Sequence, residues 1–251
     1  MSTTTFGDID TETETTQVAT TAASQATKSE VAQPSQSEAV APYTGDGPSS
    51  EDINIDHLQI LGKSSQFDPE GASIGDICIN KEFPIVPVNE PLRGILVHTR
   101  KYWKENVPYE DDTTPRFANT IEEKTHIENT TAFGGTVPVC DVTLLIERPP
   151  SFTDDETASA VFIYEFGGKE YALVKYTVQK SQAVRENYGT INVVTRARQT
   201  KGEDAGAFYF ELVSKEKGTG TKFKWHQFVL KGTATPAPAD AVEFVRSLRG
   251  E

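Results

Sequence analysis

The sequence predicts a mainly β domain, built as an antiparallel barrel or a two-sheet sandwich. Roughly eight short runs rich in β-branched and aromatic residues follow residue 55. Gly-containing connections separate most of them, and no regular alternation of strands and helices indicates a parallel sheet. An OB-like Greek-key barrel with a long inserted loop is the first expectation. A jelly roll or another sandwich is the open alternative.

Residues 1–55 have a different composition from the rest of the chain. Ser and Thr make up 18 of these 55 residues, and nine acids face a single base, Lys28, which gives a charge of −8. The segment has too little apolar surface to offset the conformational entropy lost on folding. It is therefore expected to be a disordered acidic tail. Residues 56–232 are expected to form the β-barrel domain.

The expected strands follow one another closely along the domain. Pro84 and Pro87 favour an edge position for the third run, because proline donates no ladder hydrogen bond. The fourth run, 92–107, is long enough for a bent strand that changes partners. The segments with strand character are 57–61, 75–80, 83–88, 92–107, 137–148, the hairpin 158–180 with a turn at Gly167–Gly168, 191–198, and the hairpin 207–231 with a turn at Gly218–Gly220.

Few helices are expected. One short helix is predicted near 119–124, inside the long polar segment 108–136, and a helical turn is predicted at 181–188. Residues 233–251 are expected to be a Pro/Ala linker (233–239) and a C-terminal helix at Asp240–Leu248. This helix has apolar residues at helical spacing and ends before Gly250.

Composition and motifs exclude several classes of function. No run of 18 apolar residues indicates a membrane-spanning helix, and the N-terminus lacks the pattern of a signal peptide. Cys78 and Cys140 lie in apolar runs and are expected to be buried, reduced thiols. A cytoplasmic location is expected, in the host cell if the protein is viral. No phosphate-binding loop, nucleophile motif or metal-ligand spacing was identified, so neither an enzyme, a cofactor nor a metal site is expected.

Four basic strips carry the functional prediction. Lys and Arg are interleaved with aromatic residues at 93–104, 169–180, 185–201 and 215–231, although the whole chain has a net charge of −13. Cations that contact phosphates and flat rings that stack on unpaired bases are what single-stranded nucleic acid requires. Taken singly, each strip also fits an ordinary half-buried strand, and each tryptophan also fits core packing.

The prediction assigns two roles to the side chains of these strips. The candidate phosphate contacts are Arg93, Arg100, Lys101, Lys104, Lys175, Lys180, Arg196, Arg198, Lys222 and Lys224. The candidate stacking rings are Tyr102, Trp103, Tyr171, Tyr176 and Trp225.

The strand pattern of RGILVHTRKYWK and of FYFELVSKEKGTGTKFKWHQFVLKG resembles the bacteriophage single-stranded DNA-binding proteins of the OB-fold type. The resemblance spans roughly residues 56–231 and includes no invariant motif. It implies sequence-nonspecific binding of single-stranded DNA in replication or recombination. Such proteins commonly end in an acidic tail, whereas the acidic tail of this chain lies at its N-terminus.

The sequence is also compatible with other functions and partners. A viral structural or assembly protein with a flexible N-terminal arm is the main alternative, and a carbohydrate-binding β-sandwich explains the aromatic residues but not the cations. RNA in place of DNA, replication proteins bound through the tail or the C-terminal helix, and self-association are further expected partners. No membrane partner is expected.

Overall fold

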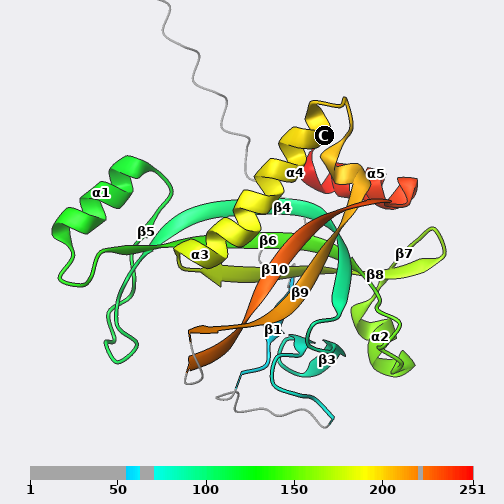
Figure 1. The fold of residues 1–251 in the computed structure, drawn as a ribbon, viewed down its shortest axis with the longest axis horizontal. Helices are drawn as coiled ribbons and strands as arrows, with labels where there is room; N and C mark the ends of the chain where they lie inside the picture. Colours follow the sequence, from blue (N-terminus) through cyan, green and yellow to red (C-terminus); the bar gives the residue numbers. More distant parts are fainter. Residues whose placement is uncertain (1–54, 63–70, 220–222, 251) are drawn as a thin grey trace, which may run out of the picture. The chain divides into compact units, whose positions relative to one another are not determined.

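The computed structural model describes residues 55–62, 71–219 and 223–250. The described residues form one ten-stranded, strongly curled sheet with helices on both of its faces (Figure 1). The strands are β1 (Asp56–Ile60), β2 (Ile77–Ile79), β3 (Phe83–Val86), β4 (Pro91–Glu105), β5 (Phe117–Ala118), β6 (Thr136–Glu147), β7 (Tyr164–Phe166), β8 (Lys169–Gln179), β9 (Phe208–Thr219) and β10 (Phe223–Pro236). The helices are α1 (Ile121–Thr130), α2 (Asp155–Val161), α3 (Ser181–Val184), α4 (Thr190–Gln199) and α5 (Ala239–Arg249), with a π-helical turn η1 (Arg185–Gly189) and a 3-10 turn η2 (Ala205–Ala207).

The strand order along the sheet is β10-β9-β4-β6-β8-β1-β2-β3. All neighbours on this path are antiparallel except β1 and β8, which pair in parallel. This pair corrects the expectation of a wholly antiparallel sheet. As expected, β3 lies at the edge and β4 changes partners, from β9 in its first half to β5 in its second.

The larger hydrophobic core fills the inside of the curl. It joins residues from both ends of the strand order, such as Leu58 and Ile79 at one end and Phe228 at the other, so it must lie on the concave face. Val142, Leu144 and Ile146 all point into it, as their alternation predicts. Cys78 and Cys140 are both buried free thiols, and burial raises the pKa of each to about 12.

A smaller core lies on the convex face beneath α5. Ile95, Leu145 and Tyr209 from the sheet contact Ala241 and Val245 of the helix. The helix covers nearly the predicted residues and ends at Gly250, whose φ of 75° is the left-handed conformation common after helices. The strand β10 continues through residues 233–236, which had been predicted to be part of a linker.

One continuous helical segment, residues 181–199, runs across the sheet as α3, η1 and α4 (Figure 1). The prediction of a strand at 191–198 is therefore wrong. Ile191 and Val194 are three residues apart and both pack on the large core, which is helical spacing. Gly232 on β10 permits this contact, because a Cβ atom there would lie 2.6 Å from Val194.

The long segment between β4 and β6 contains β5 and α1, which project to one side in Figure 1. The helix begins two residues later than predicted, behind a capping box formed by Thr120 and Glu123. The buried carboxylate of Glu105 anchors the segment by accepting hydrogen bonds from Arg116 and Thr131. These bonds lower the pKa of Glu105 to about 2. The helix α2 likewise replaces the start of the predicted hairpin at 158.

Candidate nucleic-acid interface

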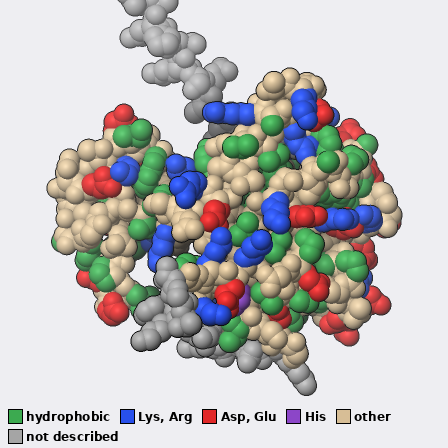
Figure 2. Space-filling model, viewed as in Figure 1, with side chains coloured by type: hydrophobic (Ala, Val, Ile, Leu, Met, Phe, Trp, Pro, Cys, Tyr) green, Lys and Arg blue, Asp and Glu red, His purple; other side chains and the backbone are tan. Residues whose placement is uncertain are grey.

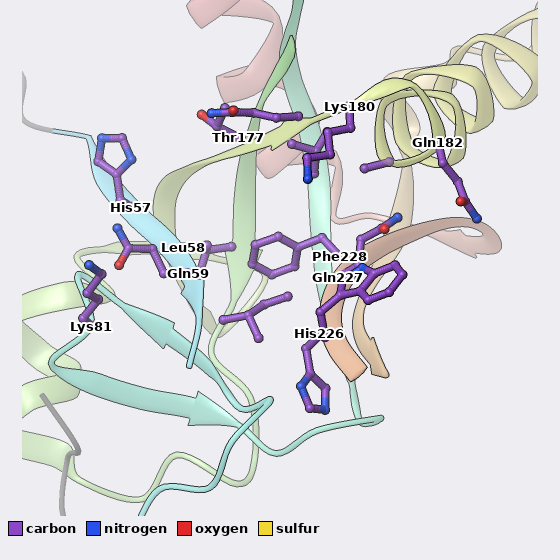
Figure 3. Close-up of a pocket in the computed structure, with 15 residues that line it drawn as sticks. His57, Leu58, Gln59, Lys81, Thr177, Lys180, Gln182, His226, Gln227 and Phe228 are labelled. Carbon is purple, nitrogen blue, oxygen red and sulfur yellow. The ribbon is translucent and has the colours of Figure 1, made fainter. Parts of the chain in front are cut away.

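A cavity of about 680 Å³ opens where the two ends of the curled sheet approach each other (Figure 3). We call it the β1–β10 pocket, because β1 and β8 line one side and β10 lines the other, with α3 beside it. Its apolar lining includes Leu58, Val178 and Ala183. Phe228 points into its centre, and its ring is held by a contact with Tyr176, with the two centroids 4.8 Å apart. The apolar part of the pocket is therefore preformed.

The described residues that line the β1–β10 pocket include no Asp or Glu, in a chain that has 37 of them. They include Lys81, Lys180, His57 and His226 instead. The His226 ring lies against Gly75 and faces away from Phe228 (Figure 3). Two other cavities of the described chain are each lined by carboxylates, with Glu216 in one and both Glu90 and Glu147 in the other. The β1–β10 pocket is thus a cationic site on an acidic protein.

Both lysines of the pocket have positive φ angles. The φ angle is 62° at Lys81 and 74° at Lys180, and only two further described residues other than glycine, Asn80 and Asn89, have positive φ. Lys180 combines this φ with a ψ of 150°, a conformation that is otherwise essentially restricted to glycine and costs roughly 1–3 kcal/mol. Non-glycine residues held in such conformations cluster at functional sites.

A second cationic group lies on the other side of α3 and η1. The ammonium of Lys101 lies 5.5 Å from the Trp103 ring centroid and 5.7 Å from that of Tyr188, so the three form a cation–π cluster. Lys101 and Trp103 are alternate residues of β4 on the concave face, and Tyr188 comes from η1. Lys101 is exposed and makes no ion pair among the described residues.

The sheet places this cluster next to the β1–β10 pocket. Trp103 is the register partner of Pro138, and the carbonyl of Pro138 accepts a 3.0 Å hydrogen bond from the backbone N–H of Lys180. Two inter-strand steps therefore separate the backbones of Trp103 and Lys180, a distance of about 10 Å. Figure 2 shows Lys and Arg side chains gathered around α3 and along β9 and β10 on the face turned to the viewer.

The wall between cluster and pocket is fixed by two polar residues of η1. The fully buried Asn187 accepts a hydrogen bond from the Tyr176 hydroxyl and donates to the carbonyls of Ala183 and Phe228. The neighbouring carboxylate of Glu186 accepts from Lys217 and Gln227. Partial burial raises the pKa of Glu186, but hydrogen bonds from Lys217 and Gln182 and the nearby charges of Lys217 and Arg185 outweigh it, so the net pKa is lowered. The helix is thereby joined to both β8 and β10.

Three predicted site residues are buried, which excludes the roles assigned to them. Tyr171 and Tyr176 have no exposed surface; the hydroxyl of Tyr171 pairs with that of Tyr209, and that of Tyr176 binds Asn187. Arg198 is 8% exposed, donates to the carbonyl of Thr233 and stacks on Phe208. Alternation along a strand gave no sign that both faces of β8 are covered.

Four predicted cations and one ring lie on the convex face of the sheet, away from the pocket. Arg100 donates to Asn119 and lies over the ring of Tyr102, whose hydroxyl binds Asp141. Burial, together with Asp141, raises the pKa of this phenol. The remaining convex-face cations, identified from their alternation and register, are Arg93 opposite Glu211, Lys104 opposite Val137, and Lys175 opposite Thr143.

The other predicted residues have mixed positions. Lys224 forms a 2.8 Å ion pair with Glu216, and Arg196 is exposed on α4 rather than on a strand. Lys222 lies outside the described residues. Lys101 and Trp103 form the cluster, while Lys180 and the 46% exposed Trp225 line the pocket.

Sequence reasoning missed His57, Lys81 and Tyr188. His57 and Lys81 meet through a turn in which the side chain of Asn80 accepts from the His57 N–H and donates to Asp56. No basic strip contains His57 or Lys81, so charge clustering could not reveal these two, whereas Tyr188 lies within the strip 185–201 but was not among the predicted rings. The one available signal is the Asn80-Lys81 turn between two apolar runs.

Among the described residues no helix is both long and apolar enough to cross a membrane. Comparison with protein-family models, with curated proteins and with solved structures finds no match for this chain.

Proposed function

We propose that the chain binds single-stranded nucleic acid, DNA or RNA, without sequence preference, along the cation–π cluster and the rim of the β1–β10 pocket. One observation carries the proposal. Lys101 and Trp103 form the cation–π cluster, and Lys180 and Trp225 line the neighbouring pocket. These four residues come from three of the predicted strips and lie beside α3. Neither Lys101 nor Lys180 has a carboxylate partner among the described residues.

The proposed roles follow from the chemistry of the strand. Lys101 and Lys180 contact phosphates, which supplies affinity that depends on salt and not on sequence. The rings of Trp103, Tyr188 and Trp225 stack on unpaired bases, and stacking tolerates every base because each has a flat π face. The backbones of Trp103 and Lys180 are about 10 Å apart, so one bound strand can contact both groups.

The proposal includes an OB-like relationship with the phage single-stranded DNA-binding proteins, and with it a role in replication or recombination. The strong curl of the sheet and the approach of β1 to β10 around a common pocket support a barrel-like origin. The tail of charge −8 would then compete with nucleic acid for the same cations.

Titration of the full chain with labelled oligo-dT at two salt concentrations tests the proposal. Tight binding that weakens steeply with salt is expected, and the variant Trp103→Ala should lose about tenfold in affinity, the effect of one lost stacking contact. The matched control is Tyr109→Ala, a fully exposed ring outside the interface, which should bind as the parent does. Absence of oligo-dT binding at low salt would overturn the proposal.

A further inference from the structure

We infer that the β1–β10 pocket takes up one nucleotide unit, with its base on the apolar floor and its two flanking phosphates on Lys180 and Lys81. The inference rests on the proposed function and extends it, because it assigns a discrete subsite where the general surface needs only contacts along a strand. A ligand for this pocket must be anionic and must also carry a flat apolar part.

The two lysines lie on different sides of the cavity. In Figure 3 Lys180 reaches down from the end of β8 toward the ring of Phe228, whereas Lys81 lies beside Gln59 and His57 at the opposite side. A single phosphate cannot use both of these positions at full strength. A nucleotide within a strand carries one phosphate on its 5′ side and one on its 3′ side, so each lysine has a phosphate of its own to contact.

The apolar floor provides the place for the base. Phe228 is 6% exposed and its ring is fixed by Tyr176, so no rearrangement of the core is needed to receive a flat ligand. Leu58 and Ala183 line the pocket beside it, and the half-exposed indole of Trp225 is at the rim. A volume of about 680 Å³ lies within the range of pockets that enclose small ligands.

The electrostatics of the lining favour a ligand of double negative charge. No carboxylate lines the pocket within the part of the chain that the structure describes, so neither phosphate meets a like charge from these residues. The positive φ angles at Lys81 and Lys180 hold cations at positions that glycine would occupy with less strain. A purely apolar ligand would make no charge-assisted hydrogen bond with the ammonium group of either lysine.

Calorimetric titration of the full chain with thymidine, thymidine 5′-monophosphate and thymidine 3′,5′-bisphosphate tests the inference. Affinity is expected to rise by about tenfold with each phosphate, because each adds charge-assisted hydrogen bonds. Lys180→Gln and Lys81→Gln should each reduce the bisphosphate to about the affinity of the monophosphate, and the double variant should reduce it to that of thymidine.

The control variant is Lys169→Gln, which lies at the other end of β8 and is ion-paired with Glu147. It should bind all three ligands as the parent does. If thymidine and its bisphosphate bind equally, or if the two pocket variants leave bisphosphate affinity unchanged, the nucleotide subsite does not exist.

Oligo-dT binding measured in parallel separates this inference from the proposed function. Salt-dependent oligo-dT binding together with failure of the bisphosphate to bind or compete overturns the subsite and leaves strand binding standing. Bisphosphate binding that depends on both lysines, together with oligo-dT no tighter than the bisphosphate, supports the subsite and overturns binding along the strand.

Discussion

Lys and Arg side chains lie both around the β1–β10 pocket and on the opposite side of the sheet under α5. The two sides differ in whether particular cations have a carboxylate partner. Near α5 and the adjoining ends of β6 and β8, three cations have carboxylate partners, whereas Arg249 of α5 donates to the backbone carbonyls of Leu96 and Val97. Lys169 pairs with Glu147 at 2.7 Å, Arg246 pairs with Asp204, and Arg148 bridges Glu170 and Asp155 at 2.7 and 2.6 Å. On the pocket side, Lys217 and Lys224 are also paired, with Glu186 and Glu216. Around the pocket, Lys81, Lys101 and Lys180 have no such partner among the described residues.

The role of a basic residue therefore depends on its partner and not on its charge alone. A paired cation joins two elements, as Arg246 joins α5 to the start of η2 through Asp204. A cation without a carboxylate keeps its attraction for an external anion, and that attraction is strongest where nearby walls exclude water.

The largest expected effect comes from breaking the wall between pocket and cluster. Asn187→Ala leaves the Tyr176 hydroxyl and the Phe228 carbonyl buried without their partner, which costs roughly 1–3 kcal/mol for each group. We expect the free energy of unfolding to fall by about 3 kcal/mol in urea titration. The control Gln199→Ala, exposed on the same helical segment, should change it by less than about 0.5 kcal/mol. An equal effect of the two variants would show that η1 does not hold the wall.

Removing residues 1–54 takes away a net charge of −8. Under the proposed function, this charge competes with nucleic acid for Lys81, Lys101 and Lys180. Affinity for oligo-dT should rise by about tenfold at low salt, and the gain should shrink as salt screens the tail. Fluorescence anisotropy of the full and shortened chains at two salt concentrations measures this. Unchanged affinity would remove the tail from the mechanism.

Exchanging one lysine from each side tests the comparison directly. Lys101→Gln should weaken oligo-dT binding about fivefold and reduce the salt dependence by about one counterion, with unfolding unaffected. Lys169→Gln should leave binding unchanged and lower the free energy of unfolding by about 0.5 kcal/mol, the usual size for a partly exposed ion pair. The opposite pattern would reverse the assignment of the two sides.

The smallest effect is a pH dependence of the α5 side. Partial burial raises the pKa of Asp204, but hydrogen bonds from Arg246 and from the Gly206 N–H outweigh it, so the net pKa lies below the ordinary value. A lowered pKa in the folded state stabilises the protein above the unfolded pKa, near 4, and this contribution is lost as pH falls further. Asp204→Asn should therefore lower the melting temperature at pH 7, with the difference disappearing below about pH 4. A difference that persists in acid would mean that the ion pair is not its source.

The sequence itself determined the strands, because their signal is local. Alternation placed Val142, Leu144 and Ile146 on one face, prolines placed β3 at an edge, and the length of β4 predicted its change of partner. The stretch INVVTRAR was assigned wrongly because β-branched residues suit both a strand and a packed helix, and only the contact with Gly232 decides between them. The parallel pairing of β1 with β8 likewise has no local signal.

For the candidate site, too, the sequence determined some features and the tertiary structure determined the others. Charge clustering in the sequence included Lys101, Trp103, Lys180 and Trp225 among its candidates, and the side chains of these four are exposed or half-exposed in the structure. It could not tell that helices would cover both faces of β8 and bury Tyr171 and Tyr176. Nor could it bring Lys81 to the pocket of Lys180, because only the curl of the sheet sets β1 against β10, and that curl depends on contacts between residues far apart in the chain.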